Sequence, residues 1–317
     1  MSLADKLFVD MCKDIIENGT DTQGEKVRPK WEDGTPAYTI KKFGVVNRYD
    51  LRKEFPALTL RRTALKSCMD EILWIYQKKS NNIKDLNSHI WDEWADKDGS
   101  IGKAYGYQID KLYIHHVERI EDGELNNRLK ELQDNYPSCK FNGICTPDNI
   151  WKVYIGLDQI DAVIYDLKNN PFSRRIIMNM YNFEELHEMN LYPCAYSMTF
   201  NVTNENGKLV LNAILNQRSQ DVLAANNWNV CQYAILLTMI AQVCDMEAGE
   251  LVHVIADAHI YSKHLEQIKE LITREQYPAP KVRLNPDIKN FYDFTTDDLI
   301  VEDYVTGPQI KNIPIAI

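Results

Sequence analysis

The sequence predicts an α/β (α+β) protein in which a mixed β-sheet packs on helices. Apolar residues recur at helical spacing in two long segments, residues 63–79 and 229–244. Two other segments, 196–202 and 208–215, alternate between apolar and polar residues as strands do. The Asn204-Glu205-Asn206-Gly207 turn sequence between them predicts a β-hairpin. Helices and paired strands are thus both expected, which defines the class.

The N-terminal part alternates helix, loop and strand. Residues 3–17 have helical apolar spacing that stops at Asn18-Gly19, and residues 20–36 are polar and rich in turn residues. Residues 37–49 resemble a strand. In the helix at 63–79, Glu71 falls near the apolar side, which is unusual for a carboxylate.

Residues 111–155 break the regular pattern, because they combine a charge-rich stretch, a short helical pattern and several turn residues. We therefore expect a single domain over residues 1–317 that carries 111–155 as an inserted subdomain. The elements expected after it are a helix at 158–168, a strand near 174–181, a short helix at 183–189, the hairpin, the helix at 229–244, a strand at 250–256, a helix at 260–273 and further strands.

Composition narrows the class of protein. The 317 residues carry 46 acidic and 36 basic side chains, a net charge of −10, which argues against a general nucleic-acid binder. No apolar run approaches the roughly 20 residues that span a membrane, and the start does not resemble a signal peptide. Seven scattered cysteines do not suggest a disulfide framework. We expect a soluble cytoplasmic protein with reduced thiols.

Cys194 and Arg218 are the strongest candidates for chemistry. The hairpin returns the chain to its starting end, which would bring the Arg218 guanidinium beside the Cys194 sulfur. A free thiol has a pKa of about 8.5, and a nearby cation favours the nucleophilic thiolate. From the residues alone, the alternative of a small buried cysteine stays open.

Adjacent arginines suggest a phosphate site. Arg174 and Arg175 follow Asn170-Pro171 and open a strand, where two guanidinium groups could bind phosphate oxygens in pairs. The alternative is a pair of solvated charges. No glycine-rich phosphate loop accompanies them.

Other candidates have plain structural alternatives. Asp257 is placed to cap the helix at 260–273, with His259 and Tyr261 in its first turn. Trp91 and Trp94 could line a pocket for a flat ligand or simply pack in the core. Cys139 and Cys145, with His115 and His116 upstream, are spaced too widely for a zinc site, and no metal is expected.

In combination, the motifs of this chain resemble the folate-dependent thymidylate synthases that use an active-site cysteine. The resemblance covers nearly the whole chain outside 111–155. It rests on Asp70-Glu71-Ile72-Leu73-Trp74, Ile90-Trp91-Asp92-Glu93-Trp94-Ala95-Asp96, Tyr105-Gly106-Tyr107-Gln108, Ser173-Arg174-Arg175, Pro193-Cys194, Gln217-Arg218-Ser219-Gln220-Asp221, Asn229, Asp257-Ala258-His259-Ile260-Tyr261, Arg274-Glu275 and Ile313-Pro314-Ile315-Ala316-Ile317.

The resemblance implies reductive methylation of dUMP to dTMP. The co-substrate 5,10-methylenetetrahydrofolate would supply both the carbon and the hydride and leave as dihydrofolate. Cys194 would add to carbon 6 of the uracil ring and so activate carbon 5, which is covalent catalysis. Arg218 would bind the phosphate and favour the thiolate.

The resemblance also assigns the remaining site residues. For dUMP they are Arg28, Gln217 and Ser219, Arg174 and Arg175 from the partner subunit of a homodimer, Asn229 at the uracil edge, and His259 and Tyr261 at the 3′-hydroxyl. Catalysis would be assisted by Glu71, which organises water and proton transfer, and by Tyr105, at the carbon 5 proton. For folate they are Asp221, Trp91, Trp94, Leu191, Arg61 at the glutamate tail, and Ile317 in a closing segment.

Two rival functions share this scaffold. A dUMP hydroxymethylase would use the same thiolate and folate but would quench the intermediate with water instead of hydride. A cytosine-specific enzyme would favour aspartate at position 229, so Asn229 favours uracil. A non-catalytic RNA-binding protein is disfavoured as the main role by the acidic net charge and by the intact Cys194, Arg218 and Asn229.

Overall fold

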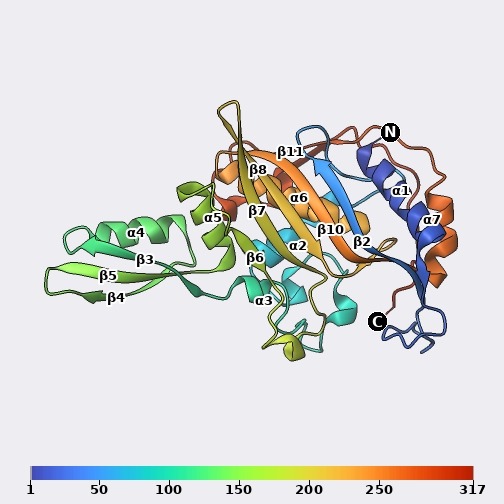
Figure 1. Cartoon of the computed structure of the whole chain (residues 1–317), viewed down its shortest axis with the longest axis horizontal. Helices are drawn as coiled ribbons and strands as arrows, with labels where there is room; N and C mark the ends of the chain where they lie inside the picture. Colours follow the sequence, from blue (N-terminus) through green and yellow to red (C-terminus); the bar gives the residue numbers. More distant parts are fainter. Residues whose placement is uncertain (1, 317) are drawn as a thin grey trace. The chain divides into compact units, whose positions relative to one another are not determined.

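The computed structural model describes residues 2–316, and the chain forms two compact units (Figure 1). One unit combines the chain up to Leu73 with the chain from Cys194 onward, and the other spans Trp74–Pro193. The predicted combination of helices with a mixed sheet is confirmed. Within residues 2–316, no helix has both the length and the apolar character that a membrane crossing requires.

The first unit is built on a mixed sheet. Its strands are β1 (Thr20–Asp21), β2 (Thr39–Asp50), β10 (Glu247–Tyr261), β8 (Lys208–Gln217) and β7 (Ala195–Glu205), in that spatial order. Figure 1 shows β2, β10, β8 and β7 running side by side. β8 runs parallel to β10, whereas the β1–β2, β2–β10 and β7–β8 pairs are antiparallel. The short β9 (Gln220–Asp221) also pairs with β10.

Helices cover one face of this sheet. α1 (Leu3–Asn18), α6 (Asn226–Val243) and α7 (Leu265–Leu271) contact its strands, and α2 (Leu65–Ile72) packs on α6. α6 is buried almost all round, because it contacts β8 and β10 on one side and α2 on the other. The C-terminal part adds the two-stranded pair β11 (Lys281–Leu284) and β12 (Leu299–Glu302) and 3-10 turns at Ser262–His264, Phe291–Asp293 and Thr296–Asp298.

The predicted hairpin is confirmed as β7 and β8. Asn206 and Gly207 both have positive φ (56° and 88°), as a two-residue hairpin turn requires. The register runs from Glu205 opposite Lys208 at the turn back to Ala195 opposite Gln217, with a shift between Ala195 and Ser197. This irregularity lies directly after Cys194, and such bulges redirect neighbouring side chains.

The second unit contains a small sheet of its own. β3 (Tyr113–Glu121), β5 (Ile150–Leu157) and β4 (Lys140–Cys145) form it in that order, and all three strands begin within residues 111–155. The other elements are α3 (Gly106–Ile109), α4 (Leu125–Asn135), α5 (Gln159–Asn169), β6 (Ile177–Asn179) and 3-10 turns at Ile83–Asp85, Asp92–Trp94 and Leu186–Glu188.

Three sequence predictions need correction. The helix expected at 63–79 ends at Ile72 and continues as a π-helical turn, η1 (Leu73–Gln77), and the helix expected at 183–189 is a single 3-10 turn. The helix expected at 260–273 starts later, because β10 continues to Tyr261. Asp257 therefore caps no helix, and His259 and Tyr261 lie on a strand. The physical reason is pairing with β2, which continues to Tyr261 opposite Thr39.

Candidate active site

Cys194 and Arg218 meet at the end of the β7–β8 hairpin, as predicted. The backbone N–H of Arg218 donates to the Cys194 carbonyl at 2.9 Å, which joins the two chain segments. The Arg218 guanidinium then donates to the Cys194 sulfur over 3.6 Å. A cation held in contact with a thiol favours the ionised form of that thiol.

The net pKa of Cys194 differs from the sequence expectation. Burial is the largest influence and raises the pKa of the thiol, while the charges of Arg218 and Arg28 lower it without cancelling that effect. The sequence identified the cation but not the cost of removing a thiolate from water. Burial thus makes ionisation of Cys194 costly, and Arg218 reduces that cost.

A second feature is a pair of carboxamides, Gln217 and Asn229, from different elements. Gln217 is the last residue of β8 and Asn229 lies in the first turn of α6. The Gln217 Nε2 donates to Asn229 Oδ1 at 3.1 Å and to the Ser219 carbonyl at 3.1 Å. Asn229 is half-buried, so its amide can present both a donor and an acceptor to a ligand.

Glu71 is buried on α2 and has a defined partner. Its Oε2 accepts a hydrogen bond of 2.7 Å from the indole Nε1 of Trp228. The indole donor stabilises the carboxylate inside the protein, because buried charges need hydrogen bonds. This explains how the odd carboxylate of the sequence is tolerated.

His259 and Tyr261 share one side of β10, two residues apart. The His259 Nδ1 lies 2.8 Å from Asp257 Oδ1, and Lys41 approaches the same carboxylate at 3.1 Å. The two rings meet edge to face at 5.0 Å. Burial raises the pKa of Tyr261 to about 12, so its hydroxyl remains a donor at neutral pH.

Asp221 connects the site to the C-terminal segment through His264. The Asp221 carboxylate accepts the N–H groups of Leu223 and Ala224 at 3.0 Å each and lies 3.4 Å from His264 Nδ1. His264 Nε2 donates to the Pro314 carbonyl at 2.8 Å. Ile317, predicted to act at this end of the chain, lies outside the described residues.

Asp221 and His264 each stabilise the charged form of the other. Burial opposes ionisation of both groups, yet hydrogen bonding and charge attraction outweigh it, which lowers the pKa of Asp221 and raises the pKa of His264. Nearby, Arg61 is buried and its guanidinium donates to the Leu223 carbonyl. Arg61 thus holds the loop that carries Asp221.

The predicted site residues of the second unit include an aromatic cluster. Trp91 contacts Trp94 with ring centroids 5.8 Å apart and Tyr105 at 4.8 Å, both edge to face. Tyr105 has an unusual positive φ of 47°, and the adjacent Gly106 has no room for a Cβ against the Ser80 backbone. Such backbone strain costs about 1–3 kcal/mol and often occurs at functional sites. Leu191, also in this unit, is half-buried.

The remaining arginines are exposed. Arg174 and Arg175 precede β6, and neither forms an ion pair within residues 2–316. Arg28 is exposed in the polar loop, and its charge influences both Cys194 and Tyr261. Of the phosphate-binding set, the structure thus brings Arg28 and Arg218 to the cysteine, and Ser219 follows Arg218 directly.

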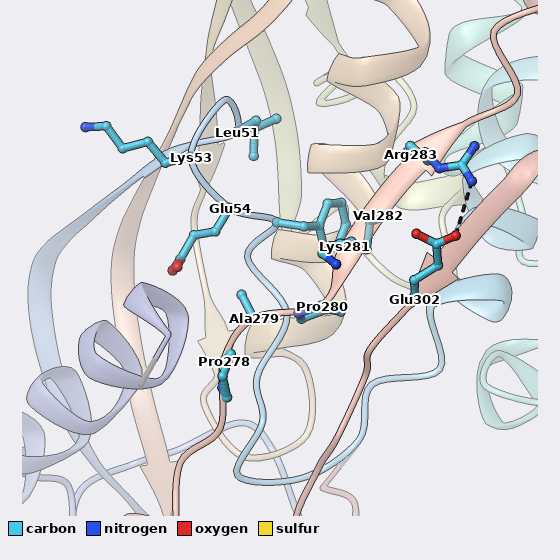
Figure 2. Close-up of a pocket in the computed structure, with 11 residues that line it drawn as sticks. Leu51, Lys53, Glu54, Pro278, Ala279, Pro280, Lys281, Val282, Arg283 and Glu302 are labelled. Atoms are coloured by element: carbon cyan, nitrogen blue, oxygen red, sulfur yellow. Dashed lines mark hydrogen bonds and ion pairs between the residues drawn. The ribbon is translucent and has the colours of Figure 1, made fainter.

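A surface cavity of about 590 Å³ lies elsewhere, between the loop after β2 and the β11–β12 pair (Figure 2). Its lining includes Lys281, Arg283 and Glu302, and Arg283 is paired with Glu302 at 3.2 Å. Lys281 is paired with Asp303 at 2.8 Å. The cavity contains none of the predicted site residues, and its basic groups already have partners.

Four residues that contact the predicted site were not identified from the sequence: Trp228, Gln232, His253 and His264. A usable signal existed for His253, which interrupts an apolar strand segment, and for Trp228, which precedes Asn229. Among residues 2–316, no three His, Cys, Asp or Glu side chains gather as a metal ion would require.

Comparison with known proteins identifies the family. The thymidylate synthase family profile matches residues 6–316. Thymidylate synthase 1 of Bacillus subtilis (strain 168) is 38% identical over 314 residues, and thymidylate synthase of Bacillus phage phi3T is 37% identical over 314 residues, each alignment covering 98% of both chains. The solved structure of thermostable thymidylate synthase A from Bacillus subtilis matches with a TM-score of 0.78 and 36% identity, covering 99% of each chain.

These likenesses confirm the resemblance and the fold that the motifs predicted, because they extend over nearly the full length of both partners. The chain therefore belongs to the thymidylate synthase family and is a methyltransferase of dTMP biosynthesis.

Proposed function

We propose that this enzyme methylates dUMP through a covalent adduct on Cys194, with 5,10-methylenetetrahydrofolate as the donor of carbon and hydride. The thiolate of Cys194 adds to carbon 6 of the uracil, which makes carbon 5 nucleophilic. Arg218 supports this role because its guanidinium contacts the sulfur and opposes the effect of burial on the thiol pKa.

Arg218 also binds the phosphate of dUMP, together with Arg28 and Ser219. Arg174 and Arg175 complete the phosphate site from a second copy of the chain, so that the active form is a homodimer. Two observations support this proposal. Both arginines are exposed without an ion pair in residues 2–316. The sheet of the first unit also leaves apolar side chains exposed, including Val46 (51%) and Ile214 (41%), as a subunit interface would.

The other dUMP contacts follow from the groups at the end of β8 and on β10. Asn229 pairs with the uracil edge, and Gln217 supports it. His259 and Tyr261 hold the 3′-hydroxyl, where the protonated Tyr261 phenol can donate. Glu71 organises water and proton transfer at carbon 4, and Tyr105 assists removal of the carbon 5 proton.

Folate binding is assigned to Asp221, Trp91, Trp94 and Leu191, with Arg61 toward the glutamate tail. Asp221 suits a hydrogen-bonded pterin because its pKa is lowered and it stays ionised. The C-terminal segment that ends in Ile317 closes over the reacting groups and excludes water. The bond from His264 to Pro314 supports a role for this segment near Asp221.

We also propose that residues 111–155 are an insertion within one synthase domain and that the enzyme works in the cytoplasm without a metal. The segment has its own three-stranded sheet, and the cysteines are odd in number and scattered.

The contact between the Arg218 guanidinium and the Cys194 sulfur is the observation that carries this proposal. The test is near-ultraviolet spectroscopy of the purified enzyme with dUMP and 5,10-methylenetetrahydrofolate. We expect dihydrofolate to form in equal amount with dTMP. Consumption of dUMP without dihydrofolate would contradict hydride transfer and indicate hydroxymethylation, and tight RNA binding without turnover of dUMP would contradict the enzymatic role.

A further inference from the structure

A groove of about 470 Å³ lies in the second unit, beside the small sheet. Its lining includes Leu129 and Lys130 of α4, Phe141 and Gly143 of β4, and Trp151 and Val153 of β5. Three consecutive residues of β4, 141–143, take part. Successive strand residues point to opposite faces of a sheet, so the groove follows the edge of β4 as well as one face. No residue of the predicted dUMP or folate sites lines it.

The position of α4 explains why the groove opens at β4. Arg128 of α4 donates two hydrogen bonds, of 2.9 and 2.8 Å, to the carboxylate of Glu118 on β3. β3 and β4 are the two outer strands of the small sheet, with β5 between them (Figure 1). The helix is thus tied to the β3 side, and the space beside β4 is left to the groove.

The backbone of β4 can accept a further strand. β4 pairs with β5 on one side, and no other strand pairs with it within residues 2–316. Alternate residues of an antiparallel pair bond across it, so about half of the N–H and C=O groups of β4 face away from β5. The six residues of β4 extend for about 20 Å, enough to pair with a short peptide.

The other edge of the small sheet has features that prevent such pairing. β3 has a register shift after Ile114 and carries two glutamates and an arginine. Bulges and charged side chains are common protection against strand addition. β4 has an unbroken register with β5 and a single charge, Lys140 at its start. Its Phe141 and Ile144 are 43% and 65% exposed.

The lining of the groove indicates the chemistry of its ligand. Lys130 is its only charged side chain, and this lysine is exposed without an ion pair within residues 2–316. Gly143 leaves the floor open, because a Cβ there would lie 3.2 Å from Trp151 Cε3 and 3.5 Å from Val153 Cγ2. The groove therefore offers an apolar floor next to a cation and unpaired backbone groups.

We propose that this groove binds an extended acidic segment of a partner protein, which adds to the small sheet along β4. Main-chain bonds to β4 hold the segment, an apolar side chain packs over Trp151 at Gly143, and an acidic side chain pairs with Lys130. A nucleic acid fits less well, because a single lysine lines the groove. A second copy that paired through its own β4 would bring like lysines together.

The test screens the full-length enzyme against a phage-displayed library of random ten-residue peptides. We expect the selected peptides to be acidic and to carry apolar residues at alternate positions, because alternate side chains of an added strand face the groove. Fluorescein-labelled synthetic copies are then measured by fluorescence polarisation. N-methylation should weaken binding about ten-fold at every second position and little between them, since each blocked donor loses one main-chain bond. No shared pattern, or equal tolerance of N-methylation everywhere, would contradict strand addition.

Two substitutions test the groove itself. Gly143→Val fills the space over Trp151, and Lys130→Glu reverses the lining charge, so each should weaken peptide binding about ten-fold or more. Gly123→Val and Lys152→Glu are the matched controls and should not change it. Gly123 stands in open space, and Lys152 points to the opposite face of the sheet from its neighbours in the groove.

Dihydrofolate formation by each variant reports whether the protein is folded, and we expect normal rates throughout. Because Lys130 is exposed, Lys130→Glu tests the groove even if Gly143→Val does not fold. Peptide binding that survives both substitutions in active enzyme would contradict this site. Self-association in sedimentation velocity that Gly143→Val abolishes would identify a second copy as the occupant and overturn the proposal. Tight binding of random-sequence RNA that is lost in the same variants would also overturn it.

Discussion

Two regions of the chain carry arginines that differ in whether the guanidinium contacts another side chain. At the end of β8, Arg218 is engaged through its backbone and its guanidinium with Cys194. Before β6, Arg174 and Arg175 are exposed and have no ion pair within residues 2–316. Both regions carry the residue type that binds phosphate, but only the first is tied to a reactive group in its own unit.

The difference has a physical basis in the surroundings. β8 lies between β7 and β10, so side chains at its end find partners on neighbouring elements. The segment before β6 lies at the surface, where a guanidinium stays hydrated at little cost. An unpaired surface arginine is available to a ligand, whereas an engaged one also tunes its neighbour. The comparison indicates that the reactive group lies at the end of β8. The exposed pair, Arg174 and Arg175, is instead available to bind a ligand or another molecule.

The largest effect is expected from replacing Cys194, the reactive group beside Arg218. Cys194→Ser should reduce turnover by more than about 1,000-fold, because a hydroxyl of high pKa is a poor nucleophile. Binding of dUMP, measured by isothermal titration calorimetry, should change little, because Arg218 and Asn229 remain. Substantial turnover by the serine variant would refute covalent catalysis at this residue.

The next prediction tests the exposed pair. Arg175→Ala should inactivate by weakening phosphate binding, yet mixing it with Cys194→Ser should restore activity in mixed dimers. One site of each mixed dimer has both intact residues, so an equal mixture should regain about a quarter of normal activity. The assay is dihydrofolate formation after subunit exchange. No recovery, with exchange verified by mass spectrometry, would place both arginines in the same chain's site.

A smaller effect is expected when the charge of Arg218 is removed and Cys194 is kept. Arg218→Gln should slow alkylation of Cys194 by iodoacetamide at pH 8 by about ten-fold, because loss of the cation raises the thiol pKa further. Iodoacetamide is neutral, so charge attraction to the reagent plays no part. Exposed Cys145 is an internal control in the same digest, and its rate should not change. Equal rates for Cys194 in both proteins would show that Arg218 does not influence the thiol.

The smallest effect concerns His253 of β10, which is buried and hydrogen-bonded to Gln217 at the end of β8. His253 has a pKa near 3 when folded and about 6.5 when unfolded, so only the unfolded state binds its proton between these values. This group therefore destabilises the fold progressively as pH falls from about 6.5 toward 3. His253→Gln should reduce the slope of unfolding free energy against pH by up to about 1.4 kcal/mol per pH unit there. Parallel profiles from chemical denaturation would argue against a buried neutral histidine.

Much of the architecture follows from local patterns. The hairpin, α1 and α6 were predicted from apolar spacing and turn residues, and the order of motifs indicated the family. The roles of the individual site residues remain predictions. In β10 a long-range neighbour overrode the local pattern, because pairing with β2 continues this strand to Tyr261. The change from α2 to a π-helical turn after Ile72 was not predicted from the apolar spacing.

The sequence alone determined that Cys194 and Arg218 meet, because a two-residue turn and paired strands set which residues face each other at the open end. Only the tertiary structure decided the state of that pair. The pKa of Cys194 depends on how much water the surrounding chain excludes, and burial outweighs the cation. The link from His253 through Gln217 to Asn229 likewise depends on a parallel strand and a helix packed over it. These residues lie far apart in the sequence, and no local sequence pattern predicts that they will be in contact. Only the folded structure brings them together.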